Sequence, residues 1–193
     1  MRSPDQFIVR PIDEKRYADT IDIAGIDFIV TSDQEDAKNS NREAVVHSLP
    51  LRYDGPIEVG DHLLVHHNVF KFYYDMKGRQ RNGKSYFRDG LFFIDDQQFF
   101  MWRKPDGDWH SVGDSCFLAP VPERETWLTK FSGSEPLLGQ VRYSNESLRE
   151  AGVKEGDIVF HQPECEYEFR VSGEVLYRMF TRNITIQYER EGV

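Results

Sequence analysis

The stretch Gly60-Asp61-His62-Leu63-Leu64-Val65 returns later in the chain as Gly156-Asp157-Ile158-Val159-Phe160, 96 residues further on. In both places a Gly-Asp pair precedes a short apolar run, and glycine tolerates the positive φ of a tight turn. Val45 and Val141 stand before the two stretches at the same offset of 96. The constant offset predicts that the chain contains one domain twice, with both aspartates fixing the turns by bonding nearby amides.

The offset between the two copies changes toward their ends. Phe7–Ile12 is similar to Cys116–Val121 at an offset of 109, and Leu91–Ile94 is similar to Leu176–Met179 at an offset of 85. The fall from 109 to 96 predicts 13 extra residues in the first copy between its first two strands. The fall from 96 to 85 predicts 11 more before Leu91, so the first copy carries two insertions. Ser48 and Ser144 are matched at 96 as well.

Short segments rich in β-branched and aromatic residues predict an all-β fold. In the first copy they are Phe7–Arg10, Ala44–His47, His62–His67, Tyr86–Ile94 and Phe99–Trp102. In the second copy they are Phe117–Ala119, Gly139–Tyr143, Asp157–His161, Tyr167–Val171, Val175–Met179 and Ile184–Tyr188. One helical turn is expected at Glu146–Glu150, capped by Asn145 or Ser147. We expect two small barrels or sandwiches, in domains 1–104 and 105–193.

Composition narrows the class of protein. The net charge of −9 argues against a phosphate-binding surface as the main function, because affinity for nucleic acid rests on clustered Lys and Arg. No stretch approaches the roughly 20 apolar residues of a membrane helix, and Met1–Arg10 lacks the apolar core of a signal peptide. Two cysteines are too few for a disulfide scaffold. We therefore expect a globular protein of the cytoplasm that binds no membrane.

The ordered motifs of the first copy resemble those of the GroES-like co-chaperonin family. Arg10-Pro11-Ile12 corresponds to the family's opening Arg-Pro-Leu-type motif, and Gly25–Thr31 to its loop glycine, apolar triplet and threonine. Ile57–Asp61 corresponds to its Val-x-x-Gly-Asp turn, and the second copy repeats this turn at Val153–Asp157. The resemblance covers most of the chain. The combination of motifs is also similar to the divergent co-chaperonin-like proteins that tailed phages carry. It implies two tandem GroES-like β-barrels, with a long loop and an inserted hairpin in the first.

The resemblance also implies a function in binding: docking on an ATP-hydrolysing chaperonin ring to assist protein folding. The docking residues would be Gly25, Ile26, Phe28, Ile29, Val30 and Thr31. Because the loop Thr20–Asn41 is otherwise polar, this apolar cluster suits burial against a partner, at about 1.5–3 kcal/mol for each side chain. The composition of Phe28–Val30 also fits an ordinary buried strand, and that alternative stays open. We expect a homo-oligomeric ring in the cytoplasm of a bacterium or an infected host cell.

A second candidate contact lies in Lys71–Lys84, which concentrates 5 basic residues against the acidic background. One interpretation is a long hairpin with an apolar stem and a solvated basic tip. The other is a contact with an acidic neighbouring subunit or with single-stranded nucleic acid, which we expect less from an acidic chain. The residues concerned are Lys71, Phe72, Tyr73, Tyr74, Lys77, Arg79 and Arg81.

Neither a catalytic motif nor a metal motif stands out. His62 and His66 would lie about 13 Å apart on one face of a strand, too far to share an ion. His161 and Cys165, with Glu164 and Glu166, are closer in sequence but lack a recognisable zinc pattern. We therefore expect no enzyme, no metal and no cofactor. The alternative to the co-chaperonin hypothesis is a structural or virion-associated β-barrel module that keeps the fold without binding a chaperonin.

Overall fold

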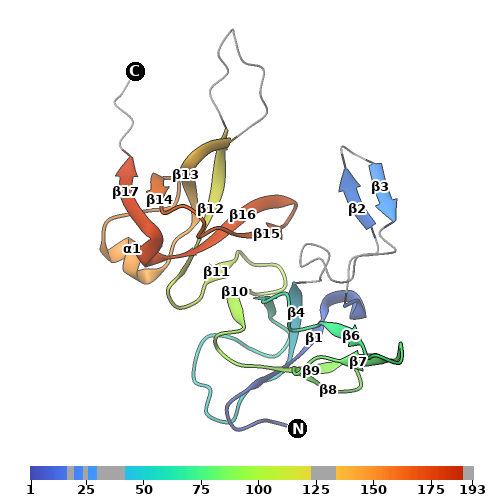
Figure 1. Ribbon diagram of the computed structural model, residues 1–193. Helices are drawn as coiled ribbons and strands as arrows, with labels where there is room; N and C mark the ends of the chain where they lie inside the picture. The colour runs from blue at the N-terminus through green and yellow to red at the C-terminus, as the bar shows by residue number, and fades with distance from the viewer. Residues whose placement is uncertain (17–19, 24–25, 30–41, 123–133, 189–193) are drawn as a thin grey trace. The chain divides into compact units, whose positions relative to one another are not determined.

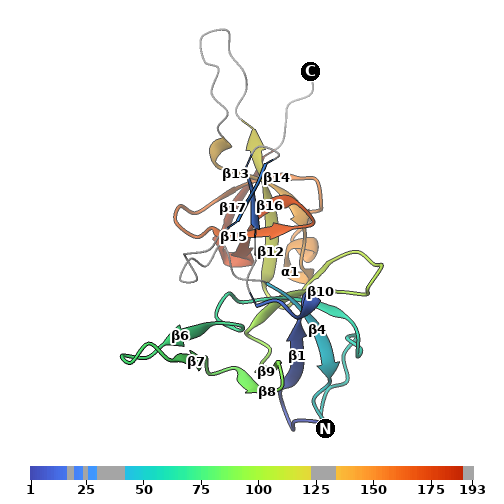
Figure 2. The same cartoon turned by 90° about the vertical axis from the view of Figure 1, so that its right-hand side faces the viewer.

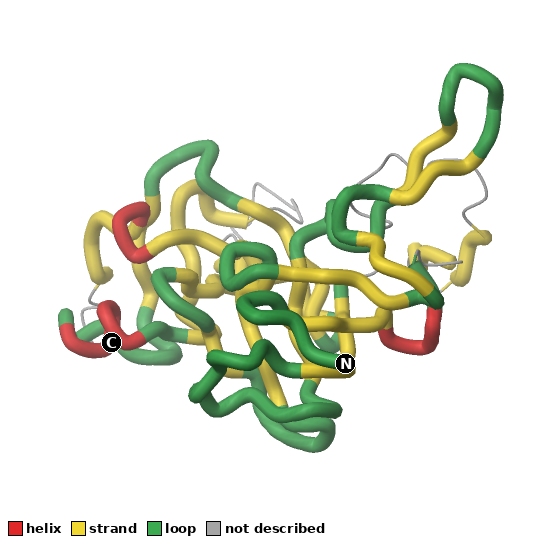
Figure 3. Tube along the Cα trace, turned by 90° about the horizontal axis from the view of Figure 1, so that it is seen from below, coloured by secondary structure: helices red, strands yellow, loops and turns green. Residues whose placement is uncertain are grey.

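The computed structural model describes residues 1–16, 20–23, 26–29, 42–122 and 134–188. It divides the chain into two compact units, Met1–His110 and Ser111–Val193. Strands and loops make up nearly all of the described chain (Figure 3), so the predicted all-β class is confirmed. No helix among the described residues is long and apolar enough to cross a membrane.

The first unit, coloured from blue to yellow-green in Figure 1, is built on a seven-stranded sheet. The order of its strands is β11-β10-β5-β4-β1-β9-β8. Its strands are β1 (Phe7–Pro11), β4 (Glu43–Ser48), β5 (His62–Val65), β8 (Tyr86–Arg88), β9 (Leu91–Ile94), β10 (Phe99–Arg103) and β11 (His110–Ser111). Two separate hairpins are inserted in it: β2 (Thr20–Ile23) with β3 (Ile26–Ile29), and β6 (Phe72–Tyr74) with β7 (Gln80–Asn82). A 3-10 turn, η1 (Ile12–Glu14), follows β1.

The second unit is built on a six-stranded sheet with the order β15-β16-β12-β13-β14-β17. Its strands are β12 (Ser115–Pro122), β13 (Ser134–Tyr143), β14 (Ile158–His161), β15 (Tyr167–Val171), β16 (Glu174–Phe180) and β17 (Ile184–Tyr188). The predicted helical turn is confirmed as α1 (Glu146–Glu150), with Asn145 as its N-cap. A 3-10 turn, η2 (Thr181–Asn183), links β16 to β17.

The two sheets share one topology. Six strands of the first sheet correspond, in chain order, to the six strands of the second. The first sheet runs β10-β5-β4-β1-β9-β8, and the second, read from its other edge, runs β17-β14-β13-β12-β16-β15. The pairing register repeats as well: Phe7 faces Ile94, and Cys116 faces Met179, at offsets of 109 and 85. The chain therefore builds the same six-stranded arrangement twice.

Irregularities in the sheets repeat at matching positions. In the first unit Ile8 faces Ser48 but Val9 faces Val46, so His47 is the extra residue of a bulge. In the second unit Phe117 faces Tyr143 and Leu118 faces Val141, which leaves Arg142 at the equivalent place. A bulge costs ladder hydrogen bonds and redirects a side chain. Its presence at the same register in both units extends the equivalence beyond strand order.

The register corrects one part of the sequence alignment. Val46, not Val45, is the counterpart of Val141, because each faces the matching residue of the first strand. The offset between β4 and β13 is therefore 95, and matching Ser48 to Ser144 was wrong by one residue. The physical reason is the helix α1, since the connection that contains it is one residue longer than its counterpart in the first unit. The first insertion thus holds 14 extra residues instead of 13, as the offset falls from 109 to 95.

Neither sheet is closed in the part of the chain that the structure describes. The first sheet runs from edge strand β11 to edge strand β8, and the second runs from β15 to β17. The predicted pair of closed barrels is therefore not observed, because no hydrogen-bonded pairing joins the edge strands. Each unit nevertheless has its own core, which includes Val9, Leu63 and Phe92 in the first and Leu118 and Val159 in the second, all fully buried.

Candidate functional site

The apolar sequence of the first insertion forms the second strand of the hairpin β2–β3. Its register places Ile21 opposite Phe28 and Ile23 opposite Ile26. The connection between β1 and β4 thus contains paired backbone at part of the predicted docking segment. Of the remaining predicted docking residues, Ile29 ends β3, while Gly25, Val30 and Thr31 lie outside the described residues.

Arg16 stands at the entrance to this insertion and is held by the second one. Its guanidinium donates to the carbonyl oxygens of Phe70 at 2.8 Å and Lys71 at 3.0 Å, and to the side-chain oxygen of Asn82 at 2.8 Å. The same group lies 5.1 Å from the ring centre of Phe92, within cation–π range. Arg16 therefore fixes the base of the β6–β7 hairpin against the sheet. Sequence reasoning missed this residue because its partners lie more than 50 positions away.

The β6–β7 hairpin extends from the first sheet (Figure 2), as one of the two interpretations of Lys71–Lys84 predicts. Its turn is organised by Asp75, whose carboxylate pairs with Arg79 at 3.1 Å and Arg81 at 3.2 Å. Backbone and side-chain hydrogen bonds, first of all from the Arg79 amide, lower the pKa of Asp75. Two of the predicted basic contacts are thus partly neutralised within the hairpin itself.

Apolar surface is the other property of this hairpin. Tyr73 and Tyr74 are 54% and 57% exposed, and Met76 at the tip is fully exposed. The other large hydrophobic side chains that are exposed in the described residues are scattered along the chain, whereas these three lie within four consecutive positions. Aromatic and methionine side chains are favoured at protein–protein contacts. The hairpin is therefore suited to a protein partner more than to a phosphate backbone.

A cleft of about 550 Å³ opens where the first insertion begins. Arg10, Glu14 and Arg16 line it from the end of β1 onward, and His47 lines it from the bulge in β4. Asp89 adds a second acidic group from the β8–β9 turn. Charges of both signs suit a polar peptide segment better than a phosphate. No motif could reveal the cleft, since the residues that line it come from distant parts of the sequence.

Both Gly-Asp turns have one geometry, which gives them a structural role. Gly60 and Gly156 have φ of 95° and 93°, in the region that favours glycine. The carboxylate of Asp61 accepts the Glu58 amide at 2.8 Å, and that of Asp157 accepts the Lys154 amide at 2.8 Å. Within the described parts of the chain, only the first aspartate also meets a cation, Lys104 Nζ at 3.1 Å.

Three histidines of the first unit, His62, His66 and His67, have structural partners. His62 lies 3.2 Å from the Arg103 guanidinium, and the rings of His66 and His67 stack with centres 4.2 Å apart. Burial, followed by the nearby His66, lowers the pKa of His67 to about 4. In the second unit the structure brings together His161, Cys165 and Glu166, whose ligand-type atoms lie within 4.8 Å of one another.

Comparison with known proteins adds no homologue to this picture: no family model matches the chain, and no curated protein matches its sequence. The inferences about function therefore rest on the repeated topology and on the two insertions of the first unit. Both insertions lie in connections between strands, where binding residues commonly occur on a rigid scaffold.

Proposed function

We propose that this chain is a non-enzymatic, co-chaperonin-like protein with two tandem GroES-like domains. It docks through Gly25–Thr31 on an ATP-hydrolysing chaperonin ring and assists protein folding there. The observation that carries the proposal is the place of the first insertion: it joins β1 to β4, the first two strands of the repeated sheet. The resembled family carries its docking loop between the corresponding strands.

The shared topology supports this proposal. Six strands recur in the same order and register, with matching bulges, as expected if two GroES-like domains arose by duplication. One of them then acquired the insertions. In this proposal, two sheets that are not closed into barrels still present the connection between their first two strands on the surface.

The energetics favour many weak contacts over one strong contact. Burying three side chains such as Ile26, Phe28 and Ile29 yields roughly 4.5–9 kcal/mol. Ordering a disordered segment costs about 2–5 kcal/mol, and a backbone already paired in β2–β3 reduces this cost. A single docking segment would therefore bind weakly. A homo-oligomeric ring presents several at once, so that the later contacts become intramolecular.

The substitution Ile29→Asp tests this docking segment. We expect it to abolish co-sedimentation with a chaperonin in the presence of ATP, because an ionised carboxylate cannot enter an apolar groove without a large cost. The matched control is Ile186→Asp, at a 61% exposed isoleucine of the second unit, which should bind as the original chain does. The mass of the native assembly, measured with and without chaperonin, gives the number of chains in the ring. Unchanged binding of the Ile29→Asp variant would refute the proposal.

A second candidate function is favoured by the exposed apolar side chains of the β6–β7 hairpin. In this alternative the chain is a structural or virion-associated module, and Tyr73, Tyr74 and Met76 form its contact. Tyr74→Asp would then weaken assembly, while Ile29→Asp would have no effect. The opposite pattern supports docking on a chaperonin.

A further inference from the structure

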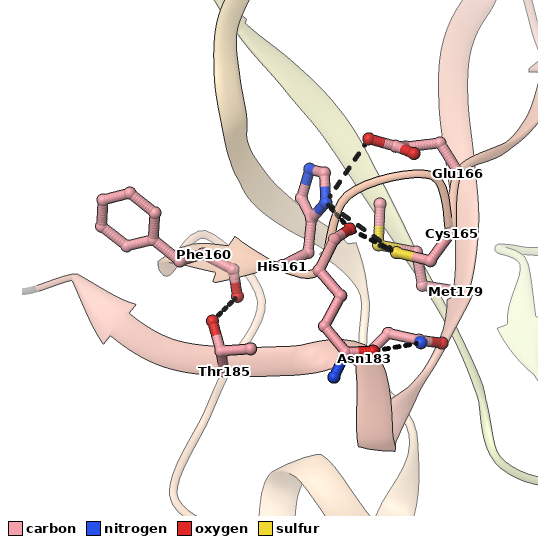
Figure 4. A network of polar contacts seen from close by, with 8 residues as sticks. Phe160, His161, Cys165, Glu166, Met179, Asn183 and Thr185 are labelled. Atoms are coloured by element: carbon pink, nitrogen blue, oxygen red, sulfur yellow. Dashed lines mark hydrogen bonds and ion pairs between the residues drawn. The ribbon is translucent and has the colours of Figure 1, made fainter.

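Three side chains with metal-binding atoms converge at the end of β14. His161 is the last residue of that strand, and Cys165 and Glu166 follow in the loop before β15 (Figure 4). Their ligand-type atoms all lie within 4.8 Å of one another. In the first unit, the register position of His161 is taken by Val65, because the two residues face the equivalent partners Ile184 and Phe99. The cluster is therefore particular to the second unit.

The spacing of these atoms approaches that of a tetrahedral ion site. His161 Nδ1 lies 3.9 Å from Cys165 Sγ and 3.6 Å from the nearer oxygen of Glu166. Bonds of about 2.0–2.3 Å at tetrahedral angles place neighbouring ligand atoms about 3.3–3.7 Å apart. Small side-chain movements would close the difference. The Glu166 side chain is 30% exposed, which leaves it room to rotate.

The loop that presents these groups is fixed by contacts outside the cluster. The Gln162 amide donates to the Asn183 carbonyl at 2.9 Å, and the Asn183 side chain donates to the Gln162 side-chain oxygen at 3.1 Å. Thr185 donates to the Phe160 carbonyl at 3.2 Å, next to the bulge that shifts the register before His161. Ligands held in this way need little reorganisation when an ion binds.

The buried side of the cluster is apolar and its other side is open. His161 is 5% exposed, and the buried Met179 places its sulfur 3.7 Å from Cys165 Sγ. Cys165 is half-buried, so an ion could enter past it and past Glu166. One imidazole, one thiol and one carboxyl in a partly buried, partly apolar site are the kinds of ligand that zinc binds.

We propose that His161, Cys165 and Glu166 form a binding site for Zn²⁺, with a fourth position left to water. The Gln162 carbonyl now accepts the Cys165 thiol at 2.8 Å and lies 2.9 Å from His161 Nδ1. As the Zn–S bond forms, the thiol loses its proton to solvent. The imidazole gives up the Nδ1 proton that now faces the Gln162 carbonyl and carries one on Nε2 instead, by exchange with solvent, which frees the lone pair of Nδ1 for the ion.

The full chain, stripped of metal with a chelator, tests this site when it is titrated with Zn²⁺ and with Co²⁺. We expect one Zn²⁺ per chain by elemental analysis, micromolar or tighter affinity, and a higher midpoint of thermal unfolding. Bound Co²⁺ should give thiolate charge-transfer absorption and intense visible bands of four-coordinate geometry. Weaker, millimolar binding or absence of the charge-transfer band would overturn the proposal.

Matched variants identify the ligands. Cys165→Ser should abolish the charge-transfer band. Cys116→Ser should keep it: Cys116 belongs to the core cluster against which Cys165 packs, but it is not one of the three residues whose ligand-type atoms lie within 4.8 Å of one another. Glu166→Gln should weaken Zn²⁺ binding by more than about 100-fold, beyond the 10–100-fold cost of losing an outer contact, while Glu164→Gln should not. If the Glu166 and Glu164 variants bind alike, or Cys165→Ser keeps the band, the assigned ligand set is wrong. Circular dichroism of the metal-free variants separates loss of binding from loss of folding.

Discussion

The guanidinium of Arg16 donates to the side-chain oxygen of Asn82 across 2.8 Å, and this bond ties the two insertions of the first unit together. Arg16 precedes the segment that leads into β2, while Asn82 is the last residue of β7. The same guanidinium also donates hydrogen bonds to the carbonyl oxygens of Phe70 and Lys71, just before the β6–β7 hairpin. One side chain in the connection that carries the first insertion thus holds the base of the second insertion.

Replacing Arg16 with alanine should loosen the β6–β7 hairpin without unfolding the unit. Charge-assisted hydrogen bonds contribute about 1.5–3 kcal/mol each, less where they are open to solvent. We expect amides of Phe72–Asn82 to exchange at least tenfold faster with deuterium, measured by mass spectrometry. The exchange rate of the Arg16→Lys variant should lie between those of the original chain and of Arg16→Ala, because lysine keeps the charge but lacks the planar guanidinium. Arg52→Ala, at an exposed arginine that pairs with Asp5 at 3.4 Å, is the control. Equal exchange in all variants would contradict this role.

Gly139→Ala tests the close packing of β12 against β13. An added methyl group at Gly139 would lie 2.8 Å from Cβ and 2.7 Å from Cδ1 of Leu118, closer than such atoms approach. We expect a loss of about 1–3 kcal/mol in the free energy of unfolding of the second unit, as for other overpacked cores. Denaturant unfolding followed by hydrogen exchange assigns the loss to one unit.

The converse substitution lies at the equivalent position of the first unit. Ala44 occupies the register position of Gly139, opposite Pro11 where Gly139 faces Pro120. Ala44→Gly should cost about 1 kcal/mol and act on the first unit alone. A Gly139→Ala variant as stable as the original chain would show that Leu118 can move aside.

The Gly-Asp repeats show how far the sequence alone can predict this fold. They locate the two equivalent turns because a left-handed glycine and a turn-fixing aspartate are local requirements, visible in adjacent residues. The register of β4 is not local: Val45 and Val46 are both plausible counterparts of Val141 by residue type, and only the pairing of Val46 with Val9 decides between them. An alignment by offset therefore missed it by one residue.

The candidate sites divide in the same way. The hairpin from Phe72 to Asn82 follows from composition, whereas the role of Arg16 depends on contacts across more than 50 residues. Cys165 and Glu166 are adjacent in sequence and only four or five residues from His161, yet their convergence on one nitrogen depends on the loop path. That path is set by Gln162 and Asn183, which no ligand pattern includes.

Asn145 joins three elements of the second unit, and its replacement should cost more than an ordinary cap. Its oxygen accepts the Leu148 amide at 2.9 Å, while its nitrogen donates to the Ser115 carbonyl and to Thr181 Oγ1. For Asn145→Ala we expect a loss of about 2–3 kcal/mol, because a lost cap costs about 1 kcal/mol and buried partners are left unsatisfied. Thermal or urea unfolding measures this loss.

Asn145→Ser separates the two roles of this side chain. Serine can cap the helix but cannot reach both other partners, so it should recover only the capping part, about 1 kcal/mol. Full recovery would mean that the bonds to Ser115 and Thr181 contribute nothing to stability.

His67 makes the first unit less stable in acid. Burial, aided by the positive charges of His66, Arg42 and Lys71, lowers the pKa of His67 from 6.5 to about 4. Between these two values the unfolded chain binds a proton that the folded chain does not, so the free energy of unfolding falls as the pH drops from 6.5 to 4. Below pH 4 the loss is complete. Because the side chain is only partly buried, we expect roughly 1–2 kcal/mol after solvent screening.

The substitution His67→Gln checks this pH dependence, with urea unfolding measured at pH 7.5, 6, 5 and 4. Glutamine cannot titrate, so the variant should lose less stability than the original chain across that interval, whatever its stability at pH 7.5. Burial, and after it Arg103, also lowers the pKa of His62, so His62→Gln should flatten the profile in the same direction. A profile as steep in both variants as in the original chain would place the acid sensitivity in carboxylates that are paired in the folded state instead.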